Sequence, residues 1–230
     1  MPSSPDRPPG VKRETPAGGA DQRLQRYCAL VAAAAVSLTA VRDPGELRRV
    51  LVDDALTALP LLDRLAPELV VDVGSGGGSP GIPLAVATGL PVVLLESRSP
   101  KAAFLRRTVE ELGLACPVVH RMAEEHGREE GRDRYDLALA RALAPPPVAL
   151  ELCLPLVRPG GHALLWVTRV DRAGAAAAAG HLGAELGPTT ATGGARGLLL
   201  VRKLGATPER FPRRPGTARR RPLRAVPSGA

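Results

Sequence analysis

One stretch, residues 70–81, constrains the fold more than any other part of the chain. It reads Val-Val-Asp-Val-Gly-Ser-Gly-Gly-Gly-Ser-Pro-Gly, so a short apolar run ends in an acid and a cluster of glycines, and the apolar-rich segment 82–87 follows. Glycine lets the backbone adopt positive φ and lets a ligand lie against bare backbone, and the helix that follows points its N-terminus at that ligand. The stretch therefore predicts a buried strand that turns sharply into a helix through a ligand-binding loop.

Apolar runs and segments with helical spacing alternate through the rest of the chain. Apolar runs typical of strands covered on both faces lie at 69–73, 91–96, 117–120, 135–140 and 163–168. Helices are expected between them at 83–88, 101–112, 147–157 and 171–180, with a short turn or helix at 122–127 and a final pair of strands at 185–191 and 197–203. The helix at 147–157 should end at Pro159-Gly160-Gly161. This order predicts an α/β, Rossmann-like fold, a doubly wound and mostly parallel sheet with an antiparallel last strand.

Two helices are expected before this alternation begins. The first starts near Asp21, and the second starts at Asp43, which can cap a helix whose first residue is Pro44. Pro60 and Pro67 should then break the chain before the first strand. The expected divisions are a disordered N-terminus at 1–20, a single domain at 21–204 with a helical cap at 21–66 and a core at 67–204, and a basic C-terminal tail at 205–230.

The net charge of +8 comes entirely from the C-terminal end of the chain. Residues 202–230 contain nine basic residues and one acid, which gives +8, so residues 1–201 sum to zero. A neutral body with a basic extension indicates a polyanion partner such as nucleic acid, and a merely solvated tail is the alternative.

The chain shows no sign of a metal site, a disulfide framework or a membrane span. Cys28, Cys116 and Cys153 are far apart and match no ligand or disulfide spacing. No apolar run approaches the ~20 residues that a membrane span needs, and the N-terminus lacks the apolar core of a signal peptide. We therefore expect reduced cysteines, no metal, no membrane contact and a cytoplasmic protein.

Polar residues follow four of the expected strands. In a parallel sheet the carboxyl ends of the strands share one edge, where ligands bind. The clusters at this edge are 72–79, 96–97, 120–124 and 140–141. Arg141 ends an apolar strand, and because a buried unpaired cation is costly it should face the pocket or an acid such as Glu124. The convergence of these clusters predicts a site.

The residues around the glycine loop select among cofactors. Ser79 stands where a dinucleotide fingerprint has its third glycine, and Asp72 suits a cationic or amine-bearing ligand. Glu96 is placed to bond a ribose diol, and Ala123-Glu124 lies where an adenine would rest. S-adenosylmethionine fits this set best. NAD is the alternative cofactor, a tight structural turn is the alternative role of the loop, and Asp72 alone could cap the loop amides.

The motifs match a known family. The segment Val-Asp-Val-Gly-Ser-Gly-Gly-Gly-Ser-Pro-Gly-Ile-Pro-Leu-Ala at 71–85 resembles the glycine loop of the RsmG (GidB) methyltransferases, which methylate N7 of a guanine in bacterial 16S ribosomal RNA. Arg-Ala at 141–142, Pro-Gly-Gly at 159–161 and Pro-Arg-Arg-Pro-Gly at 212–216 follow the same pattern. The resemblance covers about residues 24–224.

This resemblance implies a class I S-adenosylmethionine-dependent methyltransferase that acts on 16S rRNA or the small ribosomal subunit. We expect the protein to be a monomer. The implied cofactor contacts are Gly74, Ser79, Ala123, Glu124 and Arg141, supported by Asp72, Gly76 and Glu96. The implied RNA contacts are Lys101, Arg106, Arg213 and Arg214. No catalytic residue is assigned, because guanine N7 carries a lone pair and needs no general base. Deleting 205–230 is expected to weaken RNA binding and to leave cofactor binding intact.

The sequence departs from the family pattern at several positions. Ser79 replaces a bulky apolar residue, Glu96 replaces Asp, Ala102 replaces Arg, and Val50 replaces His. Two other functions remain open. A non-enzymatic RNA-binding protein could keep the same fold, and the scarcity of aromatic residues for base stacking supports it. A dinucleotide-dependent oxidoreductase is opposed by the broken GxGxxG pattern and by the lack of a proton-relay histidine.

Overall fold

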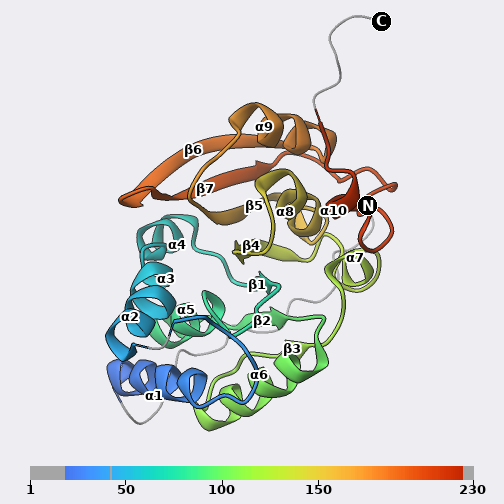
Figure 1. Ribbon diagram of the computed structural model, residues 1–230. Coiled ribbons are helices and arrows are strands. Elements are labelled where there is room, and N and C mark those ends of the chain that lie inside the picture. Colours follow the sequence, from blue (N-terminus) through green and yellow to red (C-terminus); the bar gives the residue numbers. More distant parts are fainter. Residues whose placement is uncertain (1–18, 42, 225–230) are drawn as a thin grey trace, which may run out of the picture.

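The computed structural model describes residues 19–41 and 43–224, which form one seven-stranded sheet flanked by helices (Figure 1). The strand order is β3-β2-β1-β4-β5-β7-β6. The strands are β1 (Val70–Val73), β2 (Val92–Leu95), β3 (Val118–Val119), β4 (Tyr135–Arg141), β5 (Val157–Val167), β6 (Ala184–Gly193) and β7 (Arg196–Lys203). Paired strands run parallel except β7, which is antiparallel to both β5 and β6. The predicted mostly parallel sheet with an antiparallel last strand is therefore confirmed.

The helices lie before the first strand, between the strands and after the last strand. They are α1 (Ala20–Ala32), α2 (Pro44–Arg48), the π-helix η1 (Arg49–Asp53), α3 (Asp54–Leu56), α4 (Leu59–Leu65), α5 (Gly81–Thr88), α6 (Ser99–Glu111), α7 (Ala123–His126), α8 (Pro146–Cys153), α9 (Arg172–His181) and α10 (Thr217–Arg220). The Asp43 carboxylate accepts a hydrogen bond from the Glu46 amide and Pro44 occupies the first turn of α2, as expected. The cap helices α1–α4 lie together in the lower left of Figure 1.

The two faces of the sheet pack against different helices, because successive side chains of a strand point to opposite faces. Leu94 of β2 and Leu139 of β4 pack with apolar residues of α1, α5 and α6, whereas Val93 and Ala140 pack with α8 and α9. Each face therefore has its own buried apolar cluster, and the rim of strand ends between them is left for polar residues.

Two proline-based expectations are wrong. Pro60 does not break the chain, because it lies in the first turn of α4, where the missing amide proton of proline breaks no helical hydrogen bond. Pro159-Gly160-Gly161 does not end the preceding helix. It lies within β5 as a bulge, where Tyr135 pairs with Val157 and Leu137 pairs next with His162. The positive φ of Gly160, +83°, allows the bulge.

The C-terminal segment 205–224 is not an appended tail. Phe211 and Ala218 are buried in the cluster that contains α8 and α9. The Arg132 guanidinium donates to the carbonyls of Thr207 and Phe211. The sequence expectation failed here because the basic residues dominate the composition while a few apolar and small residues carry the packing. The segment 1–20 was expected to be disordered; its residues 1–18 lie outside the described residues, as do 225–230, whereas Ala20 is the first residue of α1.

Candidate functional site

The glycine loop joins β1 to α5 at the carboxyl edge of the sheet. Gly74, Gly76 and Gly78 have φ of +72°, +54° and +101°, a region that side chains rarely adopt. Gly78 also permits close packing, since a Cβ there would lie 2.4 Å from Cδ1 of Ile82. The hydroxyl of Tyr27 in α1 donates to the Gly77 carbonyl over 2.9 Å, so the cap holds the loop from outside.

Two buried carboxylates brace this loop. Asp72, with 1% exposure, accepts a hydrogen bond from the Gly81 amide over 3.1 Å at the start of α5. Burial raises the pKa of Asp72 to about 7, although the Gly81 hydrogen bond and the nearby Arg141 oppose the shift. Glu96 accepts from the amides of Gly76, over 2.9 Å, and Arg98, over 2.7 Å. The sequence-based alternative that Asp72 caps the loop amides is thus realised at Gly81, where α5 begins.

Glu124 and Ala123 lie at the start of α7, after β3. The buried Glu124 carboxylate accepts from the Gly216 amide over 3.0 Å, so it does not pair with Arg141. Arg219 of α10 donates to the Leu143 carbonyl over 3.1 Å, and Leu143 in turn packs against Gly74. The C-terminal segment therefore forms a wall of the rim, which conflicts with the expectation that its deletion would leave cofactor binding intact.

Arg141 ends β4 beneath the cap. Its Nη1 donates to the Val50 carbonyl over 2.5 Å and to Oδ2 of Asp54 over 3.1 Å, and its Nε is buried without a partner among the described residues. Arg196, at the start of β7, reaches the other oxygen of Asp54 over 3.3 Å. The expectation that Arg141 meets an acid holds, but the acid is Asp54 rather than Glu124.

Asp54 was not singled out from the sequence. The available signal was its position on the apolar face of its helix, seven residues after Leu47 and four after Val50. An acid at such a position needs a buried partner. Only the fold identifies the partners as Arg141 and Arg196.

The remaining cofactor candidate, Ser79, points toward the cap. Its hydroxyl donates to the Leu51 carbonyl over 2.7 Å, and the residue is 9% exposed. The side chain thus fixes the loop to η1 and does not face the rim of strand ends.

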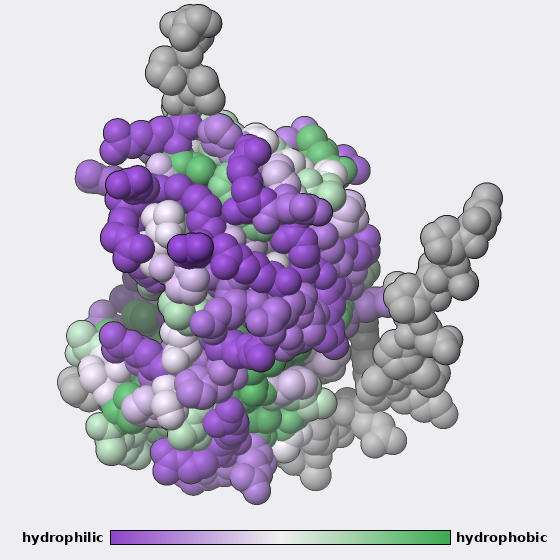
Figure 2. Space-filling model, turned by 90° about the vertical axis from the view of Figure 1, so that its right-hand side faces the viewer, coloured by the Kyte–Doolittle hydropathy of each residue, from purple (hydrophilic) through white to green (hydrophobic). Residues whose placement is uncertain are grey.

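The four proposed RNA contacts have different surroundings. Lys101 in α6 lies beside the loop, with Nζ 4.0 Å from the position of a Cβ on Gly76, and Arg106 is exposed on the same helix. Arg213 instead forms two hydrogen bonds, over 2.8 and 2.6 Å, with the buried Glu151 carboxylate of α8. Arg214 beside it is exposed. The side of the molecule that carries α7 and α10 is largely hydrophilic (Figure 2).

A cavity of about 550 Å³ opens at the carboxyl ends of β4 and β5. We call it the Trp166 cavity. Its polar and aromatic lining comes from α3, the strand ends and the start of β7, and consists of Asp54, Arg141, Trp166, Thr168, Arg169 and Arg196. Apolar lining comes from Val50 and Val167 and from the residues that lead from β4 into α8, namely Ala142, Ala144, Pro145 and Pro146.

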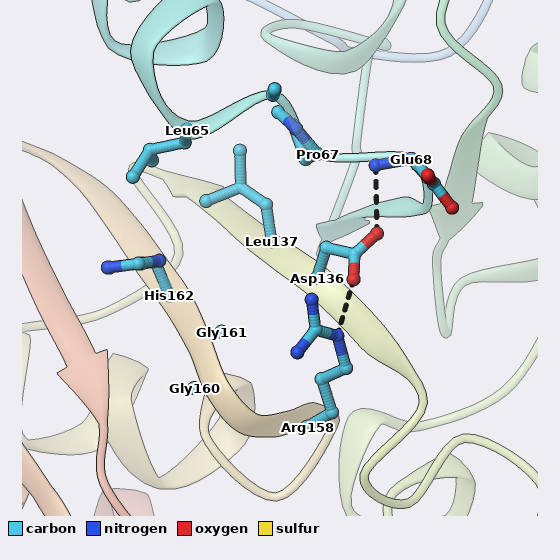
Figure 3. A pocket seen from close by; sticks show the side chains of 10 residues that line it. Leu65, Pro67, Glu68, Asp136, Leu137, Arg158, Gly160, Gly161 and His162 are labelled. Carbon is cyan, nitrogen blue, oxygen red and sulfur yellow. Dashed lines mark hydrogen bonds and ion pairs between the residues drawn. The ribbon is translucent and has the colours of Figure 1, made fainter.

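A smaller cavity of about 130 Å³ lies at the opposite edge of the sheet, where β1 and β4 begin (Figure 3). Asp136 accepts from the amides of Glu68 and Leu69, each over 2.8 Å, and from Arg158 over 2.5 Å. Burial opposes ionisation of Asp136, but these hydrogen bonds outweigh it and lower the pKa of the carboxyl. The cluster joins the starts of two strands to β5, away from every predicted site residue.

Other kinds of site find no support in the part of the chain that the structure describes. It holds no group of three or more His, Cys, Asp or Glu side chains placed to bind a metal ion. None of its helices has the length and apolar character that crossing a membrane requires.

Comparisons with known proteins place these features in context. The family model described as rRNA small subunit methyltransferase G matches residues 20–177. The protein of that name from Rubrobacter xylanophilus is 40% identical over 219 residues, covering 87% of this chain and 83% of the relative. The one from Chloroflexus aggregans is 40% identical over 198 residues, covering 81% and 82%.

Solved structures support the fold. Cofactor-bound Rv0187 from MTB has a TM-score of 0.55 at 20% identity, covering 81% of this chain and 90% of that one. A mutant of MtNAS in complex with S-adenosylmethionine has a TM-score of 0.54 at 20% identity, covering 79% and 72%. At this level of identity the likeness concerns the architecture alone.

Proposed function

The chain belongs to the rRNA small subunit methyltransferase G family, and on that premise we propose that it transfers a methyl group from S-adenosylmethionine to N7 of a guanine in 16S rRNA. The observation that carries the proposal is the convergence of the glycine loop, Asp72, Glu96, Glu124 and Arg141 on one rim from four strands. Because β1 and β4 are neighbours at the centre of the sheet, this rim includes the point where the chain order reverses, which is where such sheets bind ligands.

The residues present suit S-adenosylmethionine chemically. The Asp72 carboxylate at the end of β1 suits a cationic ligand group at the glycine loop. Glu96 keeps lone pairs for a ribose diol after binding two amides. The unpartnered Nε of Arg141 is a buried donor suited to a carboxylate. We assign further contacts to Gly74, Gly76, Ala123 and Glu124, and to the backbone at Ser79, whose hydroxyl is already engaged.

The proposed reaction needs no general base from the protein. When bound, S-adenosylmethionine supplies an electrophilic methyl group on a sulfonium. Guanine N7 attacks with its own lone pair, so the protein's part is to hold nucleophile and methyl carbon in line and to exclude water. The neutral body with exposed arginines at its C-terminal end suits a phosphate backbone. We propose that the protein acts as a monomer, without a metal, in the cytoplasm.

A methyl-transfer assay tests the proposal. The full chain is incubated with radiolabelled S-adenosylmethionine and small ribosomal subunits from cells lacking the enzyme, and the modified base is identified by nucleoside analysis. Labelled 7-methylguanosine in 16S rRNA is the expected product. Cofactor binding without transfer would favour a non-enzymatic RNA-binding protein. Preferential binding of NAD would favour the oxidoreductase.

A further inference from the structure

We infer that the Trp166 cavity receives the target nucleotide of the RNA, with the base against Trp166 and the phosphate at Arg169 and Arg196, and that Asp54 is the positioning residue that holds the cationic wall in place. The inference rests on the proposed function and assigns its acceptor side. None of the residues predicted from the sequence to contact RNA lines this cavity.

The position of the cavity separates it from the cofactor residues. In the sheet order β2-β1-β4-β5-β7, the glycine loop and Glu96 lie on the β1 and β2 side of Arg141. The cavity lies on the other side, at the ends of β4 and β5 and the start of β7. Arg141 is the single residue common to both sets. A methyl donor over β1 and β2 and an acceptor in the cavity would therefore meet at Arg141.

The charge of the cavity selects an anionic ligand. Its lining contains Arg141, Arg169 and Arg196 against the single acid Asp54, a net charge of +2. Arg141 is committed to the Val50 carbonyl and to Asp54. Arg169 is exposed and makes no hydrogen bond or ion pair with the described residues. The side chain of Arg196 is 41% exposed, and its contact with Asp54 Oδ1 is long, at 3.3 Å. These two guanidinium groups are therefore available to a phosphate, which they suit by geometry and charge.

The apolar wall selects an aromatic ligand. Trp166 is the only tryptophan of the chain, and its indole Nε1 donates to the Asp54 carbonyl over 3.0 Å. The ring is thereby fixed while part of it stays accessible. Pro145 and Pro146 supply further apolar surface in the lining. A nucleobase stacks on such a surface, and the volume of about 550 Å³ lies within the range of about 300–1,000 Å³ of small-ligand pockets.

Asp54 connects the three parts that enclose the cavity. Its two carboxylate oxygens accept hydrogen bonds from Arg141 at the end of β4 and from Arg196 at the start of β7. Its backbone carbonyl accepts from the indole of Trp166, near the end of β5. Without this carboxylate, two guanidinium groups would repel each other across the cavity and Arg141 would lose its ion-pair partner. Asp54 therefore acts on the substrate through Arg141 and Arg196 and is not itself a catalytic residue.

Steady-state kinetics on small subunits test the assignment. We expect R169Q and R196Q each to raise KM for the RNA substrate about 10-fold and to reduce the salt dependence of binding, with the dissociation constant of S-adenosylmethionine unchanged within 2-fold. The matched control is R64Q, because Arg64 is exposed in the last turn of α4, next to Leu65 of the smaller cavity at the opposite edge of the sheet, and should leave both constants unchanged. We expect D54N to raise KM for the RNA substrate as much as the double variant R169Q/R196Q does. Adding R196Q to D54N should change KM little further.

The single tryptophan gives an independent readout. A short RNA that contains the target guanine should quench Trp166 fluorescence in the wild type. Half-maximal quenching in R169Q should need about 10-fold more of this RNA. Unchanged RNA constants in folded R169Q and R196Q would overturn the inference while methylation by the wild type still upheld the proposed function. Loss of S-adenosylmethionine binding in these variants would assign the cavity to the cofactor instead. Absence of methylation by the wild type would overturn the proposed function itself.

Discussion

Replacing Arg213 by Ala should destabilise the fold rather than only weaken RNA binding. The side chain of Glu151 is 1% exposed and receives two hydrogen bonds from the Arg213 guanidinium, over 2.8 and 2.6 Å, and one from its amide over 3.2 Å. Removing one partner of a buried pair costs about 3–5 kcal/mol, because the other charge stays buried and unpaired. Since the Arg213 side chain is 25% exposed, water offsets part of that cost, and we expect the low end, about 3 kcal/mol.

Thermal unfolding followed by circular dichroism measures this effect. A loss of about 3 kcal/mol corresponds to a decrease in Tm of roughly 6–12 °C for a chain of this size. Arg214→Ala is the matched control, because Arg214 is adjacent, exposed and equally charged. It should leave Tm within about 2 °C while it weakens RNA binding. An unchanged Tm in Arg213→Ala together with a loss of RNA affinity would refute the reasoning and return Arg213 to the RNA-binding surface.

Four further results are expected. Truncation after Leu204 should lower both stability and S-adenosylmethionine affinity in unfolding and calorimetric measurements, because Phe211 is a core residue and the Gly216 amide binds Glu124; retained cofactor affinity would contradict this. Because the folded-state pKa of Asp72 is raised to about 7, its contribution to the stability of the wild type falls as pH rises from about 4 to 7. The stability of Asp72→Asn relative to wild type should therefore rise over that pH range and level off above it. A difference that does not change with pH would contradict the raised pKa. Gly78→Ala combines a φ of +101° with a Cβ 2.4 Å from Ile82 and should cost roughly 2–4 kcal/mol in denaturant titration. Gly180→Ala, in α9 with open space around it, should instead stabilise the protein by about 0.5 kcal/mol, and a loss would show an unrecognised contact.

Much of the architecture followed from local patterns. The apolar run at 69–73 and the glycines after it predicted β1 and its loop, because strand burial and positive φ depend on the residues present at each position. The regular alternation of strands and helices predicted the parallel sheet in the same way. The prediction that Pro60 breaks the chain was wrong because the effect of a proline depends on where the helix starts. The bulge at Gly160 was missed because the pairing of β5 with β4 decides it.

By itself, then, the sequence determined the order of elements, the glycine loop, the acids at the strand ends and, through its motifs, the family, which the comparisons confirmed. Only the tertiary structure decided how distant charges pair. Asp54 meets partners 87 and 142 residues away in Arg141 and Arg196, and Arg213 meets Glu151 across 62. No local pattern encodes such pairs, because each exists only where packing of the cap, the sheet and the C-terminal segment buries a charge and leaves one opposite charge within reach.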